Sequence, residues 1–259
     1  MQRGFSLVEL SIVLVILGLL TGGILAGQSL IRAAELRAVS TEYQRYLTAV
    51  SSFRDKYFAV PGDMPNATKF WGTSANCPGA YNQGTTDGTT CDGNNDGRVY
   101  FIGPNTSPTA NETFRFWQHL ASAGLIEGQY NGVSAATANN YYLAAGPDNT
   151  PFSKLNNARW NASYGNNVTG AWSSGLFHYE YSPFVFILGG ASPPNWNAGR
   201  ILKPEEAWNI DTKLDDGRAG MGKVVANWSV CTDAADGSQT GANYALSATS
   251  VDCLLMLRP

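Results

Sequence analysis

Hydrophobic residues follow two different patterns in the N-terminal part of the chain. Residues 5–31 are almost continuously apolar and contain one charged residue, Glu9. About 20 apolar residues are enough for a helix to cross a bilayer, so this run predicts a transmembrane segment at about residues 5–27. The apolar residues that follow are spaced by three or four positions: Leu36, Val39, Tyr43, Tyr46, Val50, Phe53 and Tyr57. This spacing places them on one stripe of a helix.

Together the two patterns predict one helix over residues 5–57, about 80 Å long at the usual rise per residue. Its first half is apolar on all sides, and its second half has one apolar face for a globular domain. Polar residues are expected on the opposite face: Arg37, Glu42, Arg45, Arg54 and Asp55. Val60-Pro61-Gly62-Asp63 ends the helix, because proline and glycine disfavour its continuation.

The remaining residues, 58–259, predict one globular head that is large enough to bury a core. Helical patterns cover residues 111–126 and 204–214, and the second begins at a proline. Strand patterns cover residues 99–102, 141–143, 176–188 (interrupted at Pro183), 224–230 and 253–257. A long helix packed on an antiparallel sheet satisfies this order, so the predicted fold class is α+β.

Charge and composition narrow the functional classes. The formal net charge is −3, and no basic excess is present to neutralise phosphates, so a specific nucleic-acid partner is not expected. Charged residues make up 14% of the chain, well below the share of about 25% that is usual in soluble domains. Asn, Thr, Ser, Gly and aromatic residues take their place, which is typical of extracytoplasmic surfaces.

The four cysteines indicate disulfides rather than a metal site. They allow three full pairings, and we expect Cys77–Cys91 with Cys231–Cys253 because each of these pairs closes a local loop. No pair has the C-x-x-C spacing of a zinc site, and the chain has only two histidines. Disulfides form and persist outside the cytoplasm, where an exported domain would fold.

The residues at the start of the apolar run form a specific motif. Arg3 and Gly4 precede Phe5-Ser-Leu-Val-Glu9, and an uninterrupted apolar run follows. This arrangement resembles the prepilin cleavage and methylation motif of type IV pilins and type II secretion pseudopilins. In that family a membrane peptidase cuts after the glycine and methylates the new amine. The resemblance implies that residues 1–4 are a leader peptide, that Phe5 becomes the methylated N-terminus, and that Glu9 pairs with the amine of a neighbouring subunit.

The resemblance further implies a structural subunit rather than an enzyme. Its partners would be a prepilin peptidase and other pilin-like subunits, in a homo- or hetero-oligomeric filament. Before assembly the chain would cross the inner membrane once with its head in the periplasm, consistent with Arg3 on the cytoplasmic side. After assembly it would belong to a periplasmic or extracellular filament. The predicted helix on an antiparallel sheet is similar to a pilin head.

Glycines inside the apolar run are spaced by four residues, as the pairs Gly18/Gly22 and Gly23/Gly27. Small residues at this spacing allow helices to approach closely in membranes. Glycine is also a poor helix former, so the same stretch could unwind when the helix leaves lipid for a filament. The sequence leaves both possibilities open.

Two other interpretations of the N-terminal segment explain less of it. An ordinary secretory signal needs small residues in an A-x-A-like site after the run, and Ile24-Leu25-Ala26 fits poorly at its first position. A plain membrane anchor explains the length of the run. It explains neither the Gly4-Phe5 pair nor Glu9.

A candidate metal site lies early in the head. The stretch Asp92-Gly-Asn94-Asn-Asp96-Gly matches the first half of an EF-hand-type calcium loop, with oxygen ligands at alternate positions and glycine at the turn. The glutamate that ends such a loop is missing at its usual position, but Glu112 could fold back to supply it and the backbone carbonyl of Arg98 could complete the site. Pseudopilins often bind structural calcium in head loops, so the resemblance favours a calcium cofactor over a plain Asn/Asp/Gly turn.

Other polar groups favour structural roles. Asp211, Asp215 and Asp216 are interpreted as caps of the turn that follows, with a second calcium site or a contact with a neighbouring subunit as the alternative. His119 and His178 each lie among aromatic or apolar residues and are expected to pack rather than to catalyse.

Three functional classes follow from these features. The first is a filament subunit, in a type IV pilus or a type II secretion pseudopilus. The second is an adhesin-like minor pilin whose head binds a surface or a glycan. The third, a membrane-anchored periplasmic enzyme, is disfavoured because the sequence shows no Ser-His-Asp spacing, P-loop or nucleotide-binding glycine pattern.

Overall fold

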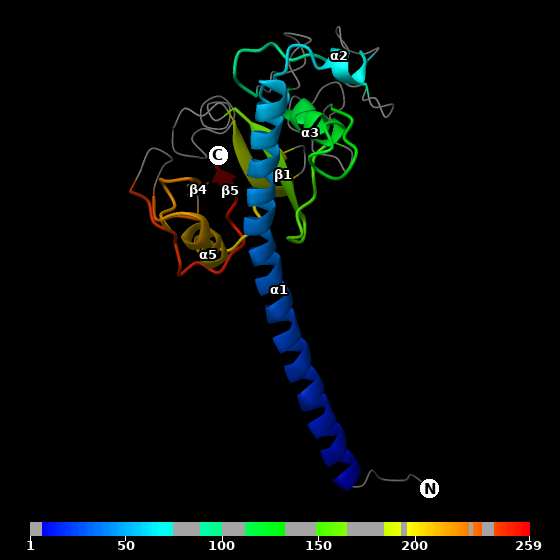
Figure 1. The fold of residues 1–259 in the computed structure, drawn as a ribbon. Coiled ribbons are helices and arrows are strands. Elements are labelled where there is room, and N and C mark those ends of the chain that lie inside the picture. The colour runs from blue at the N-terminus through cyan, green and yellow to red at the C-terminus, as the bar shows by residue number, and fades with distance from the viewer. Residues whose placement is uncertain are drawn as a thin grey trace.

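A computed structural model gives the fold of the chain. It describes residues 7–74, 89–99, 112–132, 149–164, 184–192, 196–227, 230–234 and 241–259. One long helix projects from a head built of shorter helices and strands, and the head covers only the second half of that helix (Figure 1). The structure thus confirms the predicted α+β fold, with a long N-terminal helix packed on an antiparallel sheet.

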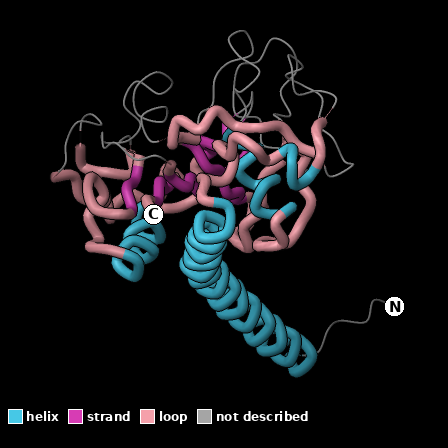
Figure 2. Tube along the Cα trace, turned by 45° about the horizontal axis from the view of Figure 1, so that its top comes forward, coloured by secondary structure: helices cyan, strands magenta, loops and turns pink. Residues whose placement is uncertain are grey.

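The long helix, α1, runs from Leu7 to Tyr57 without interruption. We call its exposed part, residues 7–31, the stalk; it is long and apolar enough to cross a membrane. Figure 2 shows the stalk projecting away from the strands of the head. The hydroxyl groups of Ser11, Thr21 and Ser29 donate to helix carbonyls three or four residues earlier. These polar groups are therefore satisfied within the helix, as a hydrocarbon environment requires.

The second half of α1 buries the predicted apolar stripe. Its buried members are Leu36, Val39, Tyr43, Tyr46, Val50 and Phe53, together with Ala49 on the same face. Only Tyr57, at the end of the helix, is partly exposed. Burial of a large apolar side chain contributes about 1.5–3 kcal/mol. The stripe is therefore the main attachment of the helix to the head.

The head contains a five-stranded antiparallel sheet with β2 at its centre. The strands are β1 (Ala158–Ser163), β2 (Val185–Ser192), β3 (Trp196–Gly199), β4 (Val224–Ala226) and β5 (Leu255–Leu257). One edge of β2 pairs with β1 along the full length of β1. The other edge pairs with β5 and, farther along, with β3, while β4 pairs with the far side of β5. The last strand in the sequence therefore lies inside the sheet.

Successive residues of the central strands point to opposite faces of the sheet, as the two-residue period of a strand requires. One set joins the main core with the stripe of α1: Phe186, Leu188, Leu255 and Leu257. The other set forms a separate buried cluster: Val185, Ile187, Val225 and Met256. Tyr46 lies within the main core, where its ring centroid is 5.0 Å from that of Trp117 and 5.6 Å from that of Trp160.

Shorter helices in the described head are α2 (Thr68–Trp71), α3 (Glu112–Ser122) and α5 (Pro204–Leu214). The bounds of α5 match the prediction, and α3 lies within its predicted range. Every residue of α3 from Glu112 to Leu120 is buried, so this helix has no exposed face along that stretch. The reason is that α3 is enclosed between α1 and β1, both of which it contacts.

The strand predictions hold in part. Residues 185–188 form the first half of β2, and the patterns at 224–230 and 253–257 shorten to β4 and β5. Residues 100–102, 141–143 and 176–183 lie outside the described residues. β1 is absent from the prediction because its sequence, Ala-Arg-Trp-Asn-Ala-Ser, lacks the alternation of a half-exposed strand, and all six of its residues are buried.

A disulfide joins Cys231 to Cys253, which confirms one of the two expected bonds. It ties the loop that follows β4 to the segment that leads into β5. Cys91 is also disulfide-bonded. Cys77 lies outside the described residues, so the Cys77–Cys91 pairing stays a prediction.

Candidate functional site

Of the residues predicted to direct processing and assembly, the structure places Glu9, near the free end of the stalk. Residues 1–6 lie outside the described residues, so the structure does not place Gly4 and Phe5. Glu9 is exposed in the first turn of α1, and it is the only charged residue of the stalk. A carboxylate in an apolar helix costs on the order of 3 kcal/mol at the membrane centre, so its position favours a functional role.

The glycines of the stalk are not explained by packing within the chain. A Cβ added at Gly18, Gly22, Gly23 or Gly27 would meet nothing within 4 Å. The helix is continuous through all four positions in this single chain. Their small size therefore leaves room for a neighbour rather than for another part of the same molecule.

A group of polar side chains, the neck cluster, joins the end of the stalk to the head. Arg32 of α1 donates from Nε to Oε1 of Glu206 at 2.6 Å and from Nη2 to Oε2 of the same residue at 2.8 Å. It also donates to Glu35 and to the backbone carbonyl of Ile201. Burial tends to raise the pKa of Glu206, but the hydrogen bonds from Arg32 and from the backbone N–H of Lys203 outweigh it and leave that pKa lowered.

A second polar contact joins the middle of α1 to the head through Glu42. Its carboxylate accepts hydrogen bonds from Ser153 Oγ at 2.6 Å, from the backbone N–H of Lys154 at 2.8 Å and from Trp160 Nε1 at 2.7 Å. The prediction of Glu42 on the polar, solvent-facing side of the helix is therefore wrong. The periodicity does not show that the loop before β1 and β1 itself reach Glu42.

The structure brings three carboxylates together where α1 meets the head's first loops. Ligand oxygens of Asp63, Asp96 and Glu112 all lie within 4.8 Å of one another, and Asp63 and Glu112 are buried. We call this group the acidic cluster. Burial raises the pKa of Asp63, while hydrogen bonds from backbone N–H groups oppose the rise. Several carboxylates at this separation suit a hard cation that prefers oxygen ligands.

The predicted ligands are placed unequally around this cluster. Asp96 and Glu112 belong to it, and Asn94 adjoins it: its side chain contacts Asp96, and its backbone N–H donates to Glu112 at 3.2 Å. The backbone N–H of Arg98 donates to Asp96. Asp92 is engaged elsewhere, because its carboxylate accepts hydrogen bonds from the N–H and Oγ1 of Thr68 and so holds the start of α2.

Asp63 is the member of the acidic cluster that the sequence did not indicate. It follows Gly62 in the turn a few residues after the end of α1, where Gly-Asp is an ordinary turn signal. Gly93 brings the loop against it, since a Cβ at Gly93 would lie 2.4 Å from the Cα of Asp63. Backbone N–H groups of Asp96 and Gly97 then donate to the Asp63 carboxylate. Only the folded chain shows this contact.

His119 is a packed residue, as expected. The backbone N–H of Gly62 donates to Nδ1 at 3.0 Å, so the proton of the neutral ring is on Nε2, next to Thr90 Oγ1 at 3.1 Å. Burial, with a smaller effect of the Arg115 charge, lowers the pKa of His119 to about 3. The ring is therefore neutral and joins the turn after α1 to the loop at residues 89–91. His178 lies outside the described residues.

The second acidic group caps the turn after α5, which agrees with its structural interpretation. Asp211 accepts hydrogen bonds from the Gly217 N–H and the Tyr244 hydroxyl, and Asp215 accepts from the Lys223 N–H. Burial raises the pKa of Asp211 to about 7, against the lowering effect of those two hydrogen bonds.

Comparison with known proteins bears on the N-terminal segment. Residues 1–25 match the family model described as the prokaryotic N-terminal methylation motif. Comparisons with curated proteins and with solved structures gave no match. The proteins marked by this motif are structural subunits, not enzymes, and the motif together with the apolar stalk indicates membrane anchoring and assembly with similar subunits. The N-terminal segment of this chain therefore carries the signature of type IV pilins and pseudopilins.

Proposed function

We propose that this chain is a structural subunit of a type IV pilus-like or type II secretion pseudopilus filament. The observation that carries the proposal is the continuous α1, whose exposed apolar half begins with the methylation motif and whose other half is built into the head. A prepilin peptidase would cut between Gly4 and Phe5 and methylate the new amine. The stalk would hold the subunit in the inner membrane before assembly and pack among other stalks afterwards.

Glu9 has a specific task in this proposal. After cleavage the amine of Phe5 lies about one helical turn from Glu9. Its own carboxylate and the amine of a neighbour can then form an ion pair inside an apolar bundle, where either charge alone would be costly. The pair would favour one axial register between adjacent stalks. The open positions at the stalk glycines supply room for the close approach that such packing needs.

The same proposal places the head outside the cytoplasm. Arg3, on the short side of the stalk, favours a cytoplasmic N-terminus. The Cys231–Cys253 disulfide on the opposite side of the stalk is consistent with an oxidising periplasm. In a filament the heads would then lie outside the packed stalks, in the periplasm or beyond the cell.

Processing is tested by expressing the full chain with a prepilin peptidase and measuring its intact mass. We expect a chain that begins at Phe5. Its mass should exceed that of the unmethylated cleaved chain by about 14 Da because of N-methylation. A Gly4→Leu variant should remain full length. An uncut wild-type chain, with the peptidase active on a control pilin, would refute the proposal.

Assembly is tested with Glu9→Gln, which keeps the shape of the side chain and removes its charge. We expect the prepilin peptidase to cut this variant normally. We expect the variant to be absent both from pilus-like filaments sheared from cells and from pseudopilus filaments that depend on the secretion system. Glu205→Gln on the exposed face of α5 is the control and should assemble. Filaments of the Glu9→Gln variant at wild-type yield would contradict the assigned role of Glu9.

We further propose that the acidic cluster binds a structural calcium ion through Asp63, Asp96 and Glu112. The support is the donor set: three carboxylates whose oxygens lie within 4.8 Å, two of them buried. Calcium takes six to eight oxygen ligands, about the number that three carboxylates and neighbouring carbonyls or water supply. Bound calcium would offset the repulsion among these groups and fix the end of α1 to the loop at residues 91–99 and to α3.

Thermal unfolding of the full chain in detergent tests the calcium proposal. After treatment with EGTA, added calcium at 100 times its dissociation constant should stabilise the chain by about 2.7 kcal/mol, and magnesium should do much less. Asp63→Asn should lose the response. Asp92→Asn should keep it, because the Asp92 carboxylate is bonded to Thr68 at the start of α2 rather than placed in the cluster. An identical response in Asp63→Asn and wild type would overturn the assignment.

A further inference from the structure

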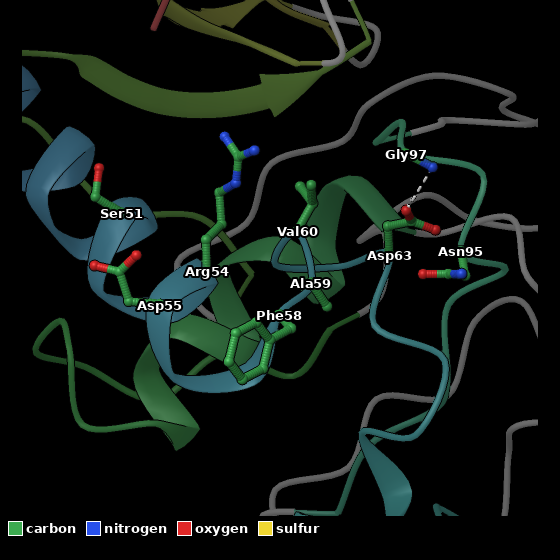
Figure 3. Close-up of a pocket in the computed structure, with 9 residues that line it drawn as sticks. All are labelled: Ser51, Arg54, Asp55, Phe58, Ala59, Val60, Asp63, Asn95 and Gly97. Atoms are coloured by element: carbon green, nitrogen blue, oxygen red, sulfur yellow. Dashed lines mark hydrogen bonds between the residues drawn. The ribbon is translucent and has the colours of Figure 1, made fainter.

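The end of the head farthest from the stalk contains an open hollow of about 630 Å³. Figure 3 shows Ser51, Arg54 and Asp55 of α1 on one side of it, and Asp63, Asn95 and Gly97 on the other, with residues 58–60 between them. Small-molecule sites usually have volumes of this size, with apolar surface and a few convergent polar groups. The place and size of the hollow therefore make it a candidate binding site outside the assembly machinery.

Packing of the described head does not account for the conformation of Phe58, one of the residues that line this hollow. It directly follows α1, and its N–H donates to the carbonyl of Arg54, so it is the residue that terminates the helix. Its φ of 53° is left-handed, a conformation that glycine or asparagine adopts at this position far more readily than a bulky side chain. Its ring is 91% exposed, so burial in the described head does not repay that strain. Strained residues of this kind cluster at functional sites.

The polar groups of the hollow provide both donors and acceptors. Arg54 offers a guanidinium, Asp55 a carboxylate, and Asn95 an amide that can do both. The side chains of these three residues make no hydrogen bond or ion pair with any residue that the structure describes. They are therefore available to a ligand, whereas the Asp63 carboxylate in the same hollow is held by backbone N–H groups.

This set of groups selects one class of ligand. A metal ion would not need Arg54, and a phosphate drawn to Arg54 would be repelled by the adjacent Asp55. An entirely apolar ligand would leave the charged groups without partners. A sugar ring has a flat C–H face that can pack on an aromatic side chain, and hydroxyl groups that donate and accept hydrogen bonds. It therefore matches both the aromatic ring and the polar groups that line the hollow.

We propose that this hollow binds a saccharide, with the Phe58 ring against the C–H face of a sugar and with Arg54, Asp55 and Asn95 bonded to its hydroxyl groups. The proposal shares with the filament proposal only the placement of the head outside the cytoplasm. Filament assembly depends on Glu9 and the stalk, at the other end of the molecule, so either proposal can fail without the other.

The test uses the full chain, purified in detergent, on a printed array of neutral and acidic glycans. We expect binding to at least one glycan, confirmed with that glycan in solution by calorimetry. Phe58→Asn should weaken this binding at least tenfold. Asparagine suits the left-handed φ, so the variant should unfold at the same temperature as wild type or higher, and its loss of binding cannot be attributed to misfolding.

Phe70→Asn is the matched control. Phe70 is an exposed aromatic residue of α2 at the same end of the head, but it does not line the hollow. We expect it to keep wild-type glycan affinity. Absence of binding to every glycan on the array overturns the proposal, as does unchanged affinity in Phe58→Asn. A Phe58→Asn variant that binds no less glycan but forms fewer filaments would assign the hollow to a contact between subunits instead.

Discussion

His119 shows how one neutral side chain makes the stability of the head depend on pH. Its pKa is about 3 in the folded chain, because of burial, and about 6.5 in an unfolded chain. Below pH 6.5 the unfolded state therefore binds a proton that the folded state does not. The stability associated with neutral His119 is complete above that pH and is lost as the pH falls toward 3, by up to about 1.4 kcal/mol per pH unit.

The measurement is urea unfolding of wild type and His119→Gln between pH 7 and pH 4.5. We expect a steeper decline of the unfolding free energy in wild type, by about the slope just given. The comparison with the variant is necessary because Asp211, whose pKa is raised to about 7, contributes with the opposite sign over much of this range. Parallel curves for the two proteins would show that His119 is protonated without cost in the folded head.

Single residues also mark where prediction from sequence stops. Asp96 was identified from an incomplete calcium motif, because motif spacing is a local property, and Glu112 was expected only as a more distant residue that could fold back onto it. Asp63 was not identified, since it precedes Asp96 by 33 positions and reaches it only through the close approach of Gly93. Asp92 satisfies the motif but caps α2. Spacing thus indicates which oxygens are near one another in sequence, and only the fold decides which share one site.

At the level of elements, the attachment of α1 to the head depends on Glu42 as well as on the apolar stripe. Glu42→Ala would leave the donor groups of the buried Trp160 and the partly buried Ser153 without their acceptor. We expect a loss of about 2–3 kcal/mol in unfolding free energy, the usual cost of unpaired groups that bonded a charge. Chemical unfolding monitored by tryptophan fluorescence measures it. Gln44→Ala, exposed on the same helix, should change stability by less than about 0.5 kcal/mol.

The disulfide joins the segments beside two short strands, β4 and β5. β4 and β5 have three residues each, and Cys231–Cys253 closes the loop that separates them. Replacing both cysteines by serine should lower the unfolding free energy by roughly 3 kcal/mol, as expected for a loop of this length. Thermal unfolding under oxidising conditions measures the loss. A double variant as stable as wild type would mean that the sheet alone holds β5 in place.

Prediction succeeded for elements whose signal is contained in their own sequence. The period of α1 and the proline that starts α5 located those helices almost to the residue. β1 was not predicted because it is buried on both faces, so the polar residues Arg159 and Asn161 indicated a loop although the fold buries both. The burial of α3 on all sides has the same origin, since neighbours distant in sequence set it.

For the whole molecule, we expect the neck cluster to help fix the angle between stalk and head, because Arg32 of α1 is bonded to Glu206 of α5. We predict that Glu206→Gln loosens this angle, because glutamine keeps the hydrogen bond to the Lys203 N–H at the start of α5 but loses the ion pair with Arg32. Spin labels at Gln28→Cys and Lys213→Cys report the distance across the neck by double electron–electron resonance in detergent. The distance distribution should broaden in Glu206→Gln.

Glu205→Gln is the control for the neck, since it removes an exposed charge beside Glu206 and should leave the distribution narrow. Native cysteines in the described part of the chain are not free, so they do not compete for the label. Equal widths in both variants would show that the apolar stripe alone fixes the stalk.

The position of β5 has a consequence for the order in which the molecule can be made. β5 follows β4 by nearly thirty residues, yet it pairs with both β2 and β4, and its leucines pack in the core with the stripe of α1. The sheet cannot close until residues 253–257 have been synthesised, so it forms only when nearly the whole chain is present. Contacts this distant in sequence also form slowly. In the proposed filament subunit, export during synthesis would therefore precede closure of the sheet.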